Sequence, residues 1–150
     1  MITDTIQAIG NLEILRYNED GDLVEKKEEK NLVVHVGKVF MMQRMQLNTN
    51  PVMSHMAVGV ANIAATTAQT LLLGENARVT LDSNTITNNT ITYIATFGAG
   101  VPNGAVTISE AAMFNNGSAN AGTMLCRVRF NEVNKANSDI IVITWNVTIQ

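Results

Sequence analysis

The feature that most constrains the fold is a strict alternation near the end of the 150-residue chain, over residues 140–149. Every second side chain is large and apolar, and the positions between are mostly Thr or Asn. A period of two is that of a β-strand with one buried and one solvent-facing side. We therefore predict a closing strand with one apolar stripe, made of Ile141, Ile143, Trp145, Val147 and Ile149.

Other short apolar or alternating segments, separated by Asn- and Gly-rich loops, predict further strands. They cover residues 9–17, 23–30, 53–60, 77–86, 89–97, 106–114 and 123–130. Strands at this spacing are typical of an antiparallel sandwich or jelly roll. The chain contains no internal repeat or linker, and its length fits one domain of ~100–150 residues. We expect a mostly β, sandwich-like or jelly-roll-like domain over residues 1–150, with strands of the sandwich in 53–150.

The first 30 residues predict a β-hairpin. Asp20-Gly21 lies between the two strands and is a strong hairpin turn signal. The turn from Asn18 to Asp22 also resembles part of a calcium loop, but the glutamate required at position 12 is missing, so we favour a plain turn. The return strand carries the charged run EKKEEK at Glu25–Lys30, which favours a position at a sheet edge.

Residues 31–46 are the one segment with a helical pattern, in the N-terminal third of the chain. Asn31 can cap the first turn, and apolar residues recur at helical spacing after it. Glycine and β-branched residues in this segment are poor helix formers, so tertiary packing must stabilise the helix. We expect a core in which the Trp145 ring packs against three helix residues, Val36, Val39 and Phe40.

Composition narrows the possible partners. Charged residues make up 15% of the chain, below the usual ~25%, and neutral Asn and Thr take their place. A neutral surface suits repeated protein contacts, because desolvating an amide costs less than desolvating an ion; a soluble protein of ordinary surface is the alternative. The net charge of −3 argues against nucleic-acid binding. No apolar segment approaches the ~20 residues of a membrane span, so we expect no membrane contact.

The sequence holds few groups suited to catalysis. His35 and His55 are the only histidines, and neither has a partner at the spacing of a metal site or a catalytic triad. The single cysteine, Cys126, cannot form an internal disulfide and lies in an apolar run that predicts burial. We therefore expect a non-enzymatic protein with no metal site and no cofactor.

Four charged residues stand in apolar surroundings, and buried ions need partners. We predict that Glu110 or Glu75 pairs with Arg127 or Arg78, as a structural clamp that fixes strand register or a subunit contact. The alternative is that these residues lie on a solvated face.

Five methionines crowd the region between the predicted helix and the next strand. Methionine adapts to irregular contacts, so a cluster larger than one small core needs predicts a subunit interface. The alternative is that the core absorbs all of them. On the first interpretation the chain is a homo-oligomer, a trimer or a dimer, with interface candidates Met41, Met42, Met45, Met53 and Met56.

The order of several segments resembles a group of tailed-bacteriophage virion proteins. The similarity lies in "DGDLVEKKEEKNLVVHVGKVFM", "MAVGVANIAATTAQTLLLGENARVTL", "ITYIATF", "TISEAAMFNNGSANAGTMLCRVRF" and "SDIIVITWNVTI". The chain departs from that pattern at Val60-Ala61-Asn62, where the group tends to carry Gly-Thr.

The resemblance implies a structural component of the virion, assembled in the host cytoplasm. It would bind copies of itself and other virion proteins, as a head-decoration (cement) protein or as a neck or tail subunit. The alternative is a host-surface glycan-binding module of a tail fibre. That function needs exposed aromatic rings, whereas Tyr17, Tyr93 and Trp145 all lie in strand patterns.

Overall fold

The computed structural model describes residues 4–46 and 49–150 and confirms a mostly β, antiparallel, sandwich-like fold with one helix. The elements in chain order are β1 (Ala8–Tyr17), β2 (Leu23–Val33), α1 (His35–Gln46), β3 (His55–Gly59), β4 (Glu75–Thr80), β5 (Ser83–Thr87), β6 (Thr90–Phe97), β7 (Val106–Phe114), β8 (Met124–Lys135) and β9 (Ile140–Ile149). Among residues 4–46 and 49–150, no helix has the length and apolar character needed to cross a membrane.

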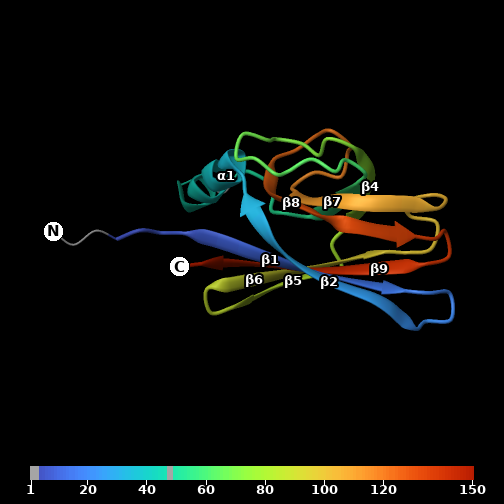
Figure 1. The fold of residues 1–150 in the computed structure, drawn as a ribbon. Helices are drawn as coiled ribbons and strands as arrows, with labels where there is room; N and C mark the ends of the chain where they lie inside the picture. Colours follow the sequence, from blue (N-terminus) through green and yellow to red (C-terminus); the bar gives the residue numbers. More distant parts are fainter. Residues whose placement is uncertain (1–3, 47–48) are drawn as a thin grey trace.

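The nine strands form one curled antiparallel sheet in the order β4-β3-β7-β8-β2-β1-β9-β6-β5. The curl brings two layers face to face, and the long strand β2 runs from one layer into the other (Figure 1). Residues 23–31 of β2 pair with β1, whereas Leu32 and Val33 pair with Arg127 and Cys126 of β8. The charged run of β2 therefore has a paired strand on one side only, as its composition favoured.

The main core lies between the two layers. Trp145 of β9 is fully buried there, and its partners in register are Leu12 of β1 and Tyr93 of β6. Ile141, Ile143 and Val147 of the same stripe are also buried. The burial of Trp145 predicted from the alternation is thus confirmed, because inward-facing residues of neighbouring strands meet on one face of the sheet.

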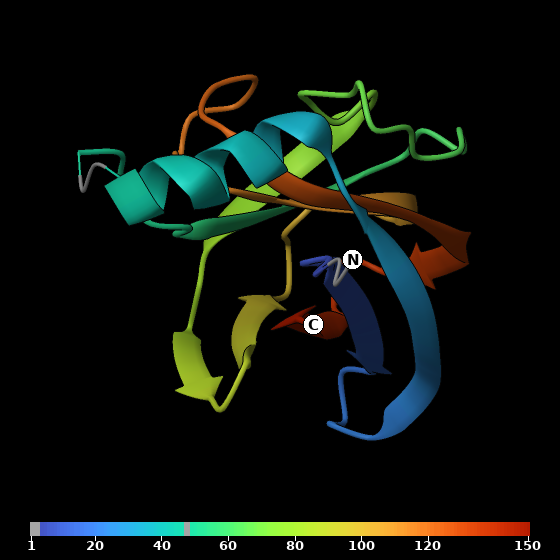
Figure 2. The same ribbon diagram turned by 90° about the vertical axis from the view of Figure 1, so that its left-hand side faces the viewer.

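A third layer covers the outer face of the β3-β7-β8 side, where α1 lies over β8 and the loop 60–74 runs beside it (Figure 2). Gly37 allows the close approach, since a Cβ there would lie 2.0 Å from the carbonyl oxygen of Leu125. Phe40 joins the main core, while Val36 packs against a second buried cluster. The members of the second cluster are Val34, Ala57, Leu72, Ala112, Phe114 and Met124.

The helix differs from the prediction in its start and in two of the three residues expected against Trp145, since Val36 packs against the second cluster and Val39 is exposed. It begins at His35, not at residue 31, and Asn31 lies in β2 opposite Gly10 instead of capping the helix. The β-branched residues that precede the helix extend the strand, because pairing with β8 satisfies their backbone there. Val39 was expected in the core but is 40% exposed, since it lies one position away from the inward-facing Phe40.

Two strand predictions also change. The segment predicted as one strand over 77–86 is divided into β4 and β5, because the chain crosses between the layers at Leu81 and Asp82. The N-terminal hairpin is not a separate unit before the sandwich, since β1 lies between β2 and β9 within the sheet.

Candidate functional site

The most enclosed polar group of the molecule is an ion pair between β7 and β8. Glu110 and Arg127 are both fully buried, and the Arg127 Nη2 and Nε atoms lie 2.7 and 3.1 Å from Glu110 Oε2. The register of β7 places both side chains on the outer face of this layer, beneath the loop 60–74. A charge pair this enclosed is stable only when its remaining donors and acceptors are satisfied.

The loop 60–74 supplies those partners. Glu110 Oε1 accepts hydrogen bonds from the backbone N–H groups of Gly74 (2.7 Å) and Ala61 (3.4 Å), and Oε2 accepts one from Leu73 (3.3 Å). Arg127 donates to the carbonyl oxygen of Ile63 and to Gln69 Oε1, both at 3.0 Å. The ion pair therefore holds both ends and the middle of a loop that has no regular structure of its own.

A glycine makes room for this arrangement. Gly59 lies opposite Glu110, and a Cβ at Gly59 would come within 2.4 Å of Glu110 Oε1 and 2.6 Å of the Gly74 carbonyl oxygen. Any side chain at this position would push the carboxylate away from the loop amides.

A second ion pair holds the loop 115–123 against the same face. Arg78 binds both carboxylate oxygens of Glu75 at 2.8 Å, and its guanidinium lies 3.8 Å from the centroid of the Phe114 ring. Its Nη1 atom donates to the carbonyl oxygens of Asn116 (2.7 Å) and Ala121 (2.9 Å). A bidentate, stacked arginine of this kind has its geometry set by several contacts at once.

The four charged residues singled out in the sequence are thus brought together in two intrachain pairs, Glu110–Arg127 and Glu75–Arg78. The interpretation as structural clamps agrees with this geometry. Each carboxylate oxygen already accepts hydrogen bonds within the chain, so neither pair is arranged to transfer a proton to a substrate.

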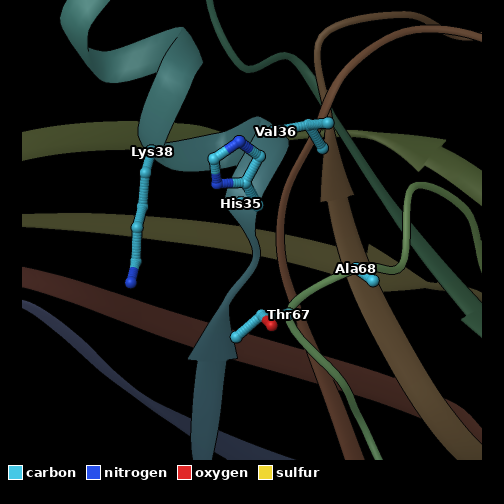
Figure 3. Close-up of a pocket in the computed structure, with 5 residues that line it drawn as sticks. All are labelled: His35, Val36, Lys38, Thr67 and Ala68. Atoms are coloured by element: carbon cyan, nitrogen blue, oxygen red, sulfur yellow. The ribbon is translucent and has the colours of Figure 1, made fainter.

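An open hollow of about 520 Å³ lies at the start of α1. It is lined by His35, Val36 and Lys38 of the first helical turn and by Thr67 and Ala68 of the loop across from it (Figure 3). The backbone N–H of His35 donates to the carbonyl oxygen of Thr67 at 2.8 Å, which joins the two walls. None of the lining residues is a carboxylate that could act as a general base beside His35.

The second histidine lies elsewhere, on β3. His55 Nδ1 is 2.8 Å from Ser54 Oγ and its Nε2 is 3.4 Å from Thr80 Oγ1. Burial lowers the pKa of His55, and the positive charge of Arg78 lowers it further. Burial likewise raises the pKa of the Cys126 thiol well above its usual value, which makes the thiolate scarce.

The structure divides the five methionine candidates between core and surface. Met53 and Met56 are buried in the main core and Met41 packs against it, so the first two cannot contact a partner, contrary to the predicted interface. Met42 and Met45 of α1 are 63% and 78% exposed. The core therefore absorbs part of the cluster and leaves the helix part on the surface.

A polar cluster that was not predicted from the sequence lies where β1 meets the β8–β9 turn. Arg16 Nη1 lies 2.9 Å from Asp139 Oδ2 and Arg16 Nε lies 3.0 Å from Glu25 Oε2. Asp139 Oδ2 also accepts the backbone N–H of Ala136 at 2.9 Å. Arg16 could have indicated this cluster, because it is a charged residue that follows Leu12 and Ile14 on the inward face of β1.

This cluster predicts an acid-sensitive contribution to stability. Burial raises the pKa of Asp139, but the Ala136 N–H bond, the bond and charge of Arg16 and the charge of Lys135 together lower it below its ordinary value. Because the pKa of Asp139 is lower in the folded than in the unfolded protein, ionised Asp139 stabilises the fold fully at pH values above its unfolded pKa of ~3.9. This stabilisation is lost as the pH falls through the folded-state pKa of Asp139.

We expect the melting temperature of the wild type to fall more steeply than that of Asp139→Asn between pH 5 and pH 2. The variant should already be less stable at pH 7, because it lacks the Arg16 charge pair. Asp20→Asn, an exposed turn residue, is the control and should follow the wild-type curve. Thermal melts followed by circular dichroism would measure this, and parallel curves for wild type and Asp139→Asn would contradict it.

Comparison with known proteins found no matching family model, no similar curated protein and no similar solved structure. Within residues 4–46 and 49–150 no three His, Cys, Asp or Glu side chains are grouped as metal ligands.

Proposed function

We propose that this chain is a non-enzymatic structural protein of a tailed-phage particle, which binds copies of itself and other virion proteins. The observation that carries the proposal is the exposed side of α1. Gly37 and Phe40 pack inward, yet Val39, Met42 and Met45 lie outward with exposed fractions of 40%, 63% and 78%. A helix that is apolar on both sides is normally buried on both sides.

A protein partner accounts for these side chains better than solvent does. Covering apolar surface contributes roughly 25 cal/mol per Å² removed from water. Methionine side chains adjust to an irregular partner surface without a fixed shape. The N-terminal half of α1 adds Lys38 and His35 at the margin, which gives the apolar area a polar rim of the kind found in interfaces.

The two ion pairs support the same proposal. They hold the loops 60–74 and 115–123 in place, and the first of these loops is bonded to the start of α1 through Thr67, so the surface beside the helix is already ordered before a partner arrives. Preformed surfaces lose less conformational entropy on binding. A modest contact of this kind, repeated by the symmetry of a particle, gives strong attachment through avidity.

The place on a phage particle rests on the sequence resemblance. The segments that carry it correspond to β2 with α1, β3 with β4, β6, β7 with β8, and β9, which are the strands around the main core and the clamps. Head decoration and a neck or tail position are both compatible with this protein-binding role. Tyr93 and Trp145 are buried, so they are not available to stack on a host-surface sugar, and we do not extend the proposal to glycan binding.

The test is the occupancy of this protein on purified particles, measured by quantitative mass spectrometry. We expect the double variant Met42→Lys/Met45→Lys to reduce occupancy at least about tenfold, which corresponds to about 1.4 kcal/mol of binding free energy. Met42→Leu/Met45→Leu is the matched control, because it keeps the apolar surface, and should occupy particles like the wild type.

Both variants should melt like the wild type, since both positions are exposed. Absence of the wild-type protein from purified particles would contradict the proposed location. Equal occupancy of the lysine and leucine variants would contradict the role of α1.

A further inference from the structure

Strand β5 is a free and uncharged sheet edge. It is the terminal strand of the nine-stranded sheet, pairs only with β6 among residues 4–46 and 49–150, and is exposed along all five residues, Ser83–Thr87. The other terminal strand, β4, carries Glu75 and Arg78, and the unpaired side of β2 carries the charged run Glu25–Lys30. Natural proteins protect exposed edges with charge, so the neutral β5 is the edge open to pairing.

We propose that β5 pairs antiparallel with β5 of a second copy of this chain, about a twofold axis at Thr85, so that two sheets become one. This deepens the proposed function, on which it rests, by naming one partner and the contact that joins it. Edge-to-edge strand addition is an established way to join proteins through main-chain hydrogen bonds, and a twofold contact uses the same patch on both copies.

The backbone of β5 is oriented for this contact. The two-residue turn Asn88-Asn89 makes Thr87 and Thr90 the closing pair of the β5–β6 hairpin. Because an antiparallel strand turns its N–H and C=O groups alternately to its two sides, Asn84 and Ile86 direct theirs to the free edge. With the axis at Thr85, Asn84 lies opposite Ile86 of the partner subunit, so these two positions can exchange hydrogen bonds twice.

The side chains agree with the same register. Ser83, Thr85 and Thr87 share the outer face, where the pairing sets Thr85 opposite itself and Ser83 opposite Thr87 of the partner subunit. Thr–Thr and Thr–Ser neighbours across strands are favourable. This extends an existing row, since Thr92 beside Thr85 already donates to Asn146 Oδ1 on the next strand.

The inner face gives the second reason. Ile86 lies opposite Ile91, which packs against the main core, yet Ile86 itself is 74% exposed because no strand lies beyond it. A second copy at this edge would supply that strand and cover Ile86 with its own β5. In the single chain, the inner face of the sheet therefore still carries an exposed apolar side chain on its last strand.

The charge pattern favours a second copy of this chain as the occupant of the β5 edge. When two copies pair about a twofold axis perpendicular to the sheet, their outer faces form one continuous face only if the residue on the axis lies opposite its own copy. In the β2 run every residue from Glu25 to Lys30 is charged, so any such axis there sets like charges face to face. In β5 every residue is neutral, and self-pairing brings no repulsion.

The test uses the residue on the axis. Thr85→Lys and Thr85→Glu each place two like charges directly opposite one another, whereas a mixture of the two variants places opposite charges there. We expect each variant alone to weaken the dimer about fivefold or more at low salt. The mixture should restore dimers, as heterodimers, to within about threefold of wild type.

The matched control is Asn11→Lys. Asn11 is exposed in the same row of the outer face, opposite Asn146, but on β1 in the middle of the layer, so it should leave the dimer unchanged. Sedimentation equilibrium of the full chain measures association. Hydrogen exchange of the Asn84 and Ile86 amides should slow as the wild-type concentration rises, because these amides become bonded only in the dimer.

A wild-type protein that stays monomeric at high concentration, or a dimer insensitive to both Thr85 variants, would overturn the inference. So would a dimer that is lost with Thr85→Lys and regained in no mixture, since this would indicate another register or a strand from another protein. Wild-type occupancy of particles by the Thr85 variants would overturn the β5 contact on the particle while the proposed function stands. If the protein dimerises through β5 but is absent from purified particles, the β5 contact stands and the proposed function is overturned.

Discussion

Replacing Trp145 with alanine is expected to lower the free energy of unfolding by about 3–5 kcal/mol, the usual loss for a large buried aromatic side chain. The ring is fully buried between the layers, with Leu12 and Tyr93 on the two neighbouring strands at the same level. Domains of this size are stable by only ~5–15 kcal/mol, so much of the protein would be unfolded at elevated temperature. Urea denaturation followed by circular dichroism would measure the loss.

Two further variants test whether the loss of stability comes from the size of the buried ring at position 145. Trp145→Phe should cost less than alanine, because it keeps most of the ring and removes an Nε1–H that has no hydrogen-bond partner among the described residues. Ile149→Ala lies on the same stripe but at its exposed end, and should cost under about 1 kcal/mol. Trp145→Ala with the wild-type urea midpoint would show that the inner face is wrongly assigned.

Replacing Arg127 with methionine is expected to cost about 3–5 kcal/mol, because the charge of Glu110 is then left buried without its partner. Glu110→Gln should cost a similar amount, since it leaves the guanidinium uncompensated and gives the loop amides a weaker acceptor. The double variant Glu110→Gln/Arg127→Met should lose less than the sum of the two single losses. The difference, measured by urea denaturation in a double-mutant cycle, is the coupling energy of the pair.

The loop 60–74 provides a second readout of the same change. Without the clamp the backbone N–H groups of Ala61, Leu73 and Gly74 lose the Glu110 carboxylate as their hydrogen-bond acceptor, so limited proteolysis should cut the loop faster than in the wild type. Glu13→Gln is the matched control: it breaks the exposed pair with Lys26 and should change stability by under about 0.5 kcal/mol. Strictly additive losses at Glu110 and Arg127 would contradict the clamp.

Several elements could be predicted from the sequence because their signals are local. The bounds predicted for residues 106–114 and 140–149 are those of β7 and β9, since an alternating or continuous apolar run specifies a strand in any sheet. The ion pairs followed from the cost of a lone buried charge, which holds whatever the fold. Phe40 and Trp145 are buried because large apolar side chains in these patterns have few other positions.

Other features depended on which segments meet. Val33 extends β2 and does not enter the helix, because Cys126, more than ninety residues later, offers it a paired strand. The helical spacing could not reveal that Val39 would face outward, as the register of α1 on β8 is set by the contact of Gly37 with Leu125.

The sequence by itself determined the strand periodicity and the mostly β fold class, and it indicated that charged residues in apolar segments need partners, since each follows from the energetics of neighbouring residues along the chain. Only the tertiary structure decided which methionines are core and which are surface, where β4 ends and β5 begins, and that β5 is left as a neutral free edge. These depend on strand order and layer contacts between residues far apart in the chain. Hydrophobic burial is non-directional, so the same apolar pattern is compatible with several strand orders until the layers assemble.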